Sequence, residues 1–173
     1  MLDSLVHRVM GGVRISDHLG GDVLRDGIEI QSSTLQFSPT ASGIWAIRVA
    51  PGFAAYARSW ETVPTVSAQE FAFEVHDRRG MFWPVAATIS LPRNLGPDAD
   101  EPRVDTPVEI VLPSSPRRAE FAGWSVITAS VTDQTGAPVQ GALVEAMPEG
   151  GGADALGWGM TGPNGMALLP HWL

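Results

Sequence analysis

The sequence predicts an all-β protein made of two small β-sandwich domains or half-domains joined by Pro-rich connectors. Several short segments alternate apolar and polar residues with a period of two and are rich in β-branched side chains, as in half-buried strands. The 19 Gly and 14 Pro among 173 residues favour many turns over long helices. Hydrophobic residues make up 44% of the chain, which is enough for a packed core in one domain or two small ones.

The N-terminus carries the one helical pattern. Apolar residues recur at i, i+3, i+4, i+7 and i+8, which predicts a short amphipathic helix with one apolar stripe: Leu2, Leu5, Val6, Val9 and Met10. Two interpretations remain open. The segment packs on its own domain as a short helix or strand, or it is an arm that docks on a partner protein.

The region after Gly11-Gly12 contains an echo of the last third of the chain. Asp17 is followed by Gly20 as Asp133 is by Gly136. Residues 27–30 similarly echo residues 141–144, and residues 42–47 echo residues 164–169. Two related sandwich halves explain this similarity, and chance similarity between Gly-rich turns is the alternative.

An N-terminal β domain is expected over residues 1–91. Residues 70–76, E-F-A-F-E-V-H, predict a strand whose Phe71, Phe73 and Val75 share one face. A turn at residues 77–80 precedes a further strand that runs through residues 88–91. Pro84 favours an edge strand or a bulge, because proline cannot donate to a sheet ladder.

Residues 92–123 are expected to form a Pro-rich connector with one short strand at residues 108–112. Four prolines alternate with acidic residues between positions 92 and 107, and such a segment cannot build a core. The acidic residues Asp98, Asp100, Glu101 and Asp105 are those a calcium site would use. They lack the alternating ligand loop closed by Glu, so solvated linker charge is the preferred interpretation.

The last third, residues 124–173, has the clearest strand and turn signals. Residues 126–133 alternate as a strand, and D-Q-T-G at 133–136 is turn chemistry in which Asp bonds its own backbone and Gly supplies a positive φ. A second strand follows over residues 142–146. The turn G-P-N-G at 162–165 leads into a third strand at 166–169.

This last third resembles the carboxypeptidase regulatory-like domain, a small transthyretin-like or immunoglobulin-like β-sandwich. The family outline is D-x-x-G-x-P-V-x-G-A-x-V, a loop and T-x-x-x-G, and the residues that fit it are Asp133, Gly136, Pro138, Val139, Gly141, Ala142, Val144, Thr161 and Gly165. The resemblance implies a fold and not an activity. The family continues with two more strands, so a neighbouring chain or an earlier segment is expected to complete the sandwich.

No pattern in the sequence points to catalysis or to a cofactor, so a non-enzymatic protein is expected. The four His residues are not at metal-ligand spacing, and G-x-S-x-G, G-x-G-x-x-G and phosphate-loop motifs are missing. Hydroxyisourate hydrolases share the transthyretin-like fold but end in Tyr-Arg-Gly-Ser, whereas this chain ends Pro170-His171-Trp172-Leu173. The sequence therefore predicts no catalytic, metal or cofactor residues and no small-molecule substrate.

Composition narrows the expected partners and location. The formal net charge of −8 argues against nucleic acid, which requires basic groups. Without a long apolar run, a secretory signal pattern or cysteine, a cytoplasmic protein is expected. Two of the six tryptophans, Trp158 in a Gly-rich loop and Trp172 at the end, are candidates for partner contact, because aromatic anchors dominate interface energies.

The overall layout also resembles small proteins associated with phage tail-like contractile injection particles. The similar parts are S-G-I-W-A-I, R-R-G-M-F-W-P-V-A-A-T-I-S-L-P, V-L-P-S-S-P and the domain beginning G-W-S-V-I. The resemblance implies a structural or adaptor subunit of the baseplate, spike or cap region, with other subunits as partners. The alternative is a free-standing module that recognises carbohydrate or peptide.

Overall fold

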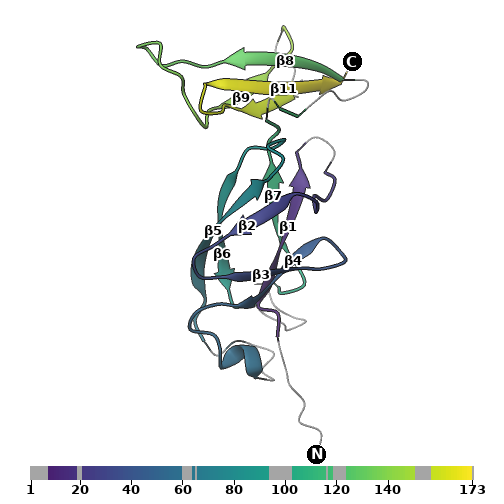
Figure 1. Cartoon of the computed structure of the whole chain (residues 1–173), viewed down its shortest axis with the longest axis vertical. Coiled ribbons are helices and arrows are strands. Elements are labelled where there is room, and N and C mark those ends of the chain that lie inside the picture. Colours follow the sequence, from purple (N-terminus) through teal and green to yellow (C-terminus); the bar gives the residue numbers. More distant parts are fainter. Residues whose placement is uncertain are drawn as a thin grey trace, which may run out of the picture. The chain divides into compact units, whose positions relative to one another are not determined.

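In a computed structural model, the protein is all-β over the described residues, as predicted; these are 8–18, 21–59, 64, 66–93, 103–115, 117–118, 124–150 and 157–172. The chain divides into two compact units (Figure 1). The first comprises Met1–Ser16, Val23–Val75 and Val85–Val111. The second comprises Asp17–Asp22, His76–Pro84 and Leu112–Leu173, so it is assembled from three separate parts of the sequence.

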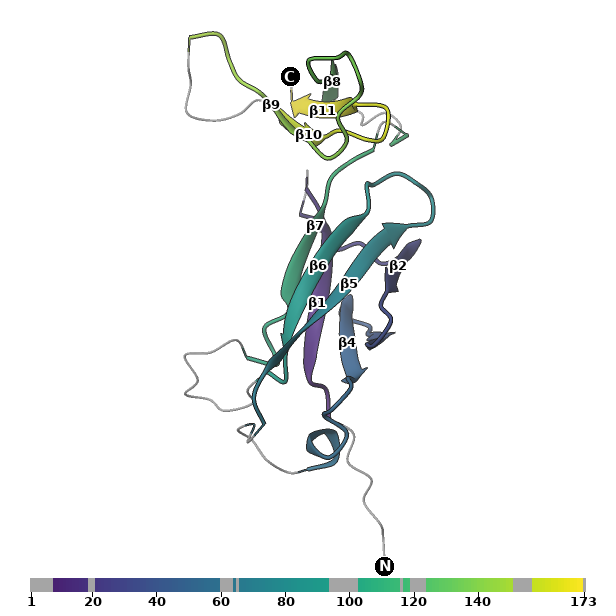
Figure 2. The same cartoon turned by 90° about the vertical axis from the view of Figure 1, so that its left-hand side faces the viewer.

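The first unit is a sandwich of a four-stranded and a three-stranded sheet (Figure 2). The larger sheet has the order β3-β4-β1-β7 and the smaller one β2-β5-β6. The strands are β1 (Gly11–Asp17), β2 (Ile28–Gln31), β3 (Gln36–Pro39), β4 (Ile44–Val49), β5 (Gln69–Asp77), β6 (Val85–Leu91) and β7 (Val108–Leu112). β7 lies in the segment expected to be a connector, and it completes the larger sheet beside β1.

The core of the first unit comes from the alternating strands. Phe71, Phe73 and Val75 are all buried, as the period-2 pattern predicts. They face apolar residues of the larger sheet and its loops, and the Phe73 ring lies 5.4 Å from that of Phe37. Each fully buried side chain of this size contributes about 1.5–3 kcal/mol through removal of apolar surface from water. The two sheets therefore hold together as layers around a shared core.

Among its described residues, the second unit has four strands in two two-stranded sheets. β8 (Trp124–Ser130) pairs antiparallel with β11 (Met166–Trp172), and β9 (Leu143–Ala146) pairs antiparallel with β10 (Gly157–Met160). A Cβ atom at Gly157 would lie 2.3 Å from the Pro170 carbonyl oxygen. β10 thus lies directly against β11, an approach that only a glycine backbone permits.

Two strand pairings, β1 with β4 and β8 with β11, reproduce the part of the sequence echo that they contain. We call residues 10–49 the first repeat and residues 126–172 the second repeat. Arg14 is paired with Ile44 in the first repeat, and the corresponding Ser130 is paired with Met166 in the second. The same correspondence relates Gly12–Ala46 to Thr128–Leu168. β1 and β4 therefore match β8 and β11 in direction and in register.

The turns of the two repeats match as well. Thr40 N–H donates to the Ile44 carbonyl, as Gly162 N–H donates to that of Met166. An isolated bridge joins Ser16 to Val23, and its counterpart joins Thr132 to Pro138. Gly43 and Gly165 both have a positive φ, +81° and +72°. We infer that the echo reflects two versions of one strand-and-turn unit.

Two expectations need a further statement. Most of the predicted N-terminal helix lies outside the described residues, and residues 8–10 have no helical assignment. The Gly-rich segment expected to be a loop holds β10, which includes Trp158. This strand is too short and too rich in glycine to be recognised from alternation.

Candidate functional site

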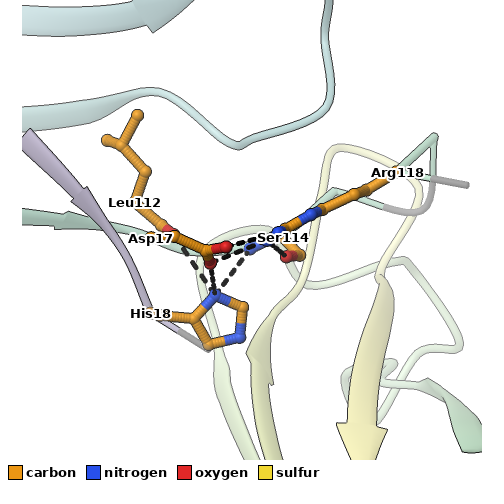
Figure 3. Close-up of polar contacts among 5 residues, drawn as sticks. All are labelled: Asp17, His18, Leu112, Ser114 and Arg118. Atoms are coloured by element: carbon orange, nitrogen blue, oxygen red, sulfur yellow. Dashed lines mark hydrogen bonds and ion pairs between the residues drawn. The ribbon is translucent and has the colours of Figure 1, made fainter. Parts of the chain in front are cut away.

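The second unit contains a buried ion pair between Asp17 and Arg118 (Figure 3). The Arg118 guanidinium donates from Nη1 to Asp17 Oδ1 at 2.7 Å and from Nη2 to Asp17 Oδ2. The same Nη1 donates to the Ser114 hydroxyl at 2.8 Å, and the guanidinium lies 4.6 Å from the centre of the Phe82 ring. This bidentate ion pair connects the C-terminal end of β1 to the segment that follows β7.

His18 lies beside this ion pair. Its Nδ1 is 3.2 Å from the Ser114 amide and 3.3 Å from the Leu112 carbonyl oxygen. Its ring centre is 4.5 Å from that of Trp158. Burial lowers the pKa of His18, and the nearby Asp17 carboxylate only partly opposes that effect. The imidazole is therefore held in its neutral form over a wider pH range than usual.

This cluster has the residue types of an acid–base catalyst but not the arrangement. Ser114 is completely buried, and its hydroxyl accepts from Arg118. The His18 Nδ1 contacts main-chain groups of Leu112 and Ser114. A nucleophile must reach both its base and a substrate. The geometry is that of a structural clamp, and the sequence patterns did not reveal it because Asp17 and Arg118 lie far apart in the chain.

A surface cavity of about 490 Å³ lies in the second unit. The aromatic and proline residues that line it are Phe82, Trp83, Pro84 and Pro163, and the polar or charged ones are His76, Asp77, Ser115, Arg117 and Asn164, with Gly80 between them. The Asp77 carboxylate accepts from the backbone N–H groups of Arg79 and Met81. The Asp77 carboxylate therefore stabilises the turn that follows it in the sequence. The Trp83 indole N–H is buried without a hydrogen-bond partner in the described structure.

Large apolar side chains are exposed on the strands of the second unit. Val126 and Ile127 on β8 are 44% and 41% exposed, and Leu143 on β9 is 60% exposed. The first repeat differs, because Met10, the counterpart of Val126, is 1% exposed. At Val126 and Ile127 the second repeat therefore presents to solvent the positions that Met10 and Gly11 occupy, buried, in the first repeat. Exposed apolar strands of this kind are typical of protein interaction surfaces.

The predicted contact residues are described only in part. Leu2, Leu5 and Val6 lie outside the described residues, and Val9 is half-buried beside a cavity of about 190 Å³. Trp158 is half-buried against His18. Trp172 pairs with Trp124 in the β8–β11 ladder, and its side chain lies outside the described atoms. Partner contact through these residues therefore stays a prediction.

The described part of the chain holds neither a cluster of metal ligands nor a membrane-spanning helix. There, no group of three or more His, Asp or Glu side chains is placed to hold a metal ion. Of the proposed acidic cluster, only Asp105 is described, and it pairs with Arg103 at 2.8 Å. Within the same described residues, no helix has the length and apolar character needed to cross a membrane.

Comparison with known proteins returned no relatives. No protein-family model matches the chain, and neither the curated proteins nor the solved structures contain a match.

Proposed function

We propose that this chain is a non-enzymatic structural or adaptor subunit that acts through protein–protein contacts of its β-sandwiches. The assembly that its sequence resembles is a phage tail-like contractile injection particle. Its partners would then be other subunits of the baseplate, spike or cap region, met in the cytoplasm. The sequence resemblance supports the proposed type of assembly. The exposed apolar residues of the second unit support the proposed protein–protein contact.

One observation carries the proposal. The second repeat has the same strand register as the first, yet it leaves Val126, Ile127 and Leu143 uncovered, whereas Met10 of the first repeat is buried. Burying apolar area contributes roughly 25 cal/mol per Å². A partner that covers the second repeat therefore gains the stabilisation that the first unit obtains from its own strands.

Sedimentation tests this proposal directly. The full chain, tagged and expressed in the cells that encode it, should sediment with high-mass particles when lysate is separated on a density gradient. Cross-linking followed by mass spectrometry should then place the second unit beside another subunit of the particle. Recovery of the chain only among low-mass proteins would refute the proposal. An unrelated tagged β-sandwich of similar mass serves as the control.

The cavity of about 490 Å³ favours a second candidate function, recognition of carbohydrate or peptide. Trp83 supplies an aromatic surface, and Arg117 and Asn164 supply hydrogen-bond donors. Such a combination of apolar walls and a few polar groups is typical of ligand sites. Titration with oligosaccharide and peptide libraries, followed by Trp fluorescence, distinguishes this function. Binding that Trp83→Ala abolishes in a folded protein would favour the module over the assembly subunit.

A further inference from the structure

We propose that the free edge of β8 takes up an extended strand from a partner protein, whose apolar side chains alternate as those of β7 do. This inference rests on the proposed function, because it names the contact through which the subunit would join its assembly. It follows from a difference between the two repeats in the neighbours of one strand.

The first repeat shows what occupies this edge. β1 lies between β4 and β7 in the order β3-β4-β1-β7, and Arg14 on β1 reaches Glu109 on β7 at 2.9 Å. In the second repeat, β8 takes the place of β1 and β11 takes that of β4. The described residues supply no strand on the other side of β8. The position that β7 fills beside β1 is therefore open beside β8.

The register shows which backbone groups face that open position. Val126 is opposite Pro170, which has no N–H, and Val131 N–H donates to the Gly165 carbonyl. Hydrogen-bonded and non-bonded pairs alternate along an antiparallel ladder. Ile127 and Ala129 therefore bond to β11. The N–H and C=O groups of Val126, Thr128 and Ser130 point to the free edge, where they can bond an added strand.

The first repeat also indicates the chemistry of the occupant. On β7, Ile110 and Leu112 are buried, while Glu109 and Val111, which alternate with them, are exposed. A strand with this alternation would place one row of apolar side chains against the exposed Val126 or Ile127. Glu109 pairs with Arg14, whose counterpart is the uncharged Ser130, so an acidic residue is not required at that point.

We commit to a different protein as the source of the strand. The chain carries a formal net charge of −8, so two molecules of it repel each other when their edges approach. A partner of neutral or basic character lacks this repulsion. Strand addition by such a partner also covers an edge that otherwise favours aggregation.

Amide hydrogen exchange followed by NMR tests the inference on the full chain. In the free protein, the amides of Val126, Thr128 and Ser130 should exchange fast, and those of Ile127 and Ala129 slowly. The probe is a synthetic peptide with the β7 sequence, T-P-V-E-I-V-L-P, residues 106–113. Its binding should slow exchange of the three edge amides by about tenfold or more. A peptide in which Glu and Ile exchange places breaks the alternation and should not.

Matched variants locate the contact. Val126→Lys should weaken peptide binding by about tenfold. Val111→Lys, at an equally exposed valine of β7 (43% against 44%), should leave it unchanged. Thr128→Pro removes an edge N–H without touching the β8–β11 ladder and should abolish edge protection; its NMR spectrum reports whether the fold is kept.

Three results would overturn the inference. Edge amides that are already protected in dilute free protein would mean that the chain fills its own edge. Protection that rises with protein concentration alone would assign the edge to a second molecule of this chain. Failure of the β7 peptide to protect the edge would remove the predicted chemistry. If the wild type and Thr128→Pro both sediment with particles, the edge inference fails while the proposed function stands.

Discussion

The two repeats share strand register and turn geometry but have different surroundings. In the first repeat, β1 is flanked by two strands, and six of its seven residues are buried. In the second, β8 has β11 on one side, and Val126 and Ile127 are exposed. The shared part is therefore one antiparallel strand pair, β1–β4 or β8–β11, with its turns. In the first half of the chain, β3 and β7 extend this pair into a four-stranded sheet, and β2, β5 and β6 form the second layer of the sandwich.

This difference shows that residues at equivalent positions have different roles when different parts of the chain cover them. Asp17 and Asp133 hold the same place in their repeats. Asp17 is buried and paired with Arg118. Asp133 is exposed and accepts from the Thr135 hydroxyl and the Ala137 amide, which lower the pKa of its carboxyl. One residue is part of a buried clamp, and the other shapes a surface turn.

The largest difference in stability between the repeats is expected when a charged residue replaces Met10, which immediately precedes β1. Met10→Asp should destabilise the protein by more than about 4 kcal/mol, because it puts a charged carboxylate in place of an apolar side chain that is only 1% exposed. Val126→Asp, at the equivalent exposed position, should change the unfolding free energy by no more than about 0.5 kcal/mol. Urea denaturation of both variants measures the difference. Equal losses would show that β8 is covered in the same way as β1.

The aspartates give the next largest effect. Asp17→Ala should cost about 3–5 kcal/mol, because it removes the carboxylate that balances the charge of the buried Arg118 guanidinium. Asp133→Ala should cost clearly less, because its hydrogen bonds lie at the exposed surface. Urea midpoints, read from Trp fluorescence, compare the two. A smaller loss for Asp17→Ala than for Asp133→Ala would contradict the assignment of Asp17 to a buried clamp.

Substitution of the turn glycines should give a smaller difference in stability between the two repeats. Gly43→Ala and Gly165→Ala should each cost about 1–2 kcal/mol, because both positions have a positive φ. Gly165→Ala should cost more. A Cβ there meets the Val131 carbonyl oxygen at 2.5 Å, whereas at Gly43 it meets movable side-chain atoms of Val23 and Arg25. Thermal unfolding measures both variants, and the reverse order would contradict the geometry.

The smallest effect concerns pH. Burial lowers the pKa of His18, with Asp17 raising it and Arg118 lowering it less strongly. The unfolded chain takes up a proton near pH 6.5, before the folded protein does, so stability present above that pH falls as the pH drops below it. His18→Gln installs the residue of the second repeat, Gln134, and should flatten the urea midpoint between pH 7.5 and 5.5. An unchanged slope would remove His18 as the cause.

Local patterns predicted individual strands better than their arrangement. Residues 108–112 form β7 as expected, and the alternation of Phe71, Phe73 and Val75 marks their buried face. Alternation of apolar and polar residues does not indicate which strands pair, so the pairing of β7 with β1 was not predicted. β10 was not predicted as a strand, because its sequence G-W-G-M contains two glycines and no β-branched residue.

The candidate sites were less accessible from the sequence for a related reason. Asp17 and Arg118 meet across 101 positions, and the echo that contains Asp17 does not include Arg118. Exposure of Val126 depends on which strands are missing around it, a property that no short segment encodes. The sequence echo was the useful signal, because it told us which positions of the two halves to compare.

The discontinuous second unit has a consequence for anyone who wishes to isolate it. Its members Asp17–Asp22 and His76–Pro84 are made long before the strands that they join. A fragment that starts at residue 124 would lack both, together with Arg118, and should behave as a poorly ordered peptide. During translation, these early segments must wait until residues 112–173 have left the ribosome, so the second unit should mature after the first.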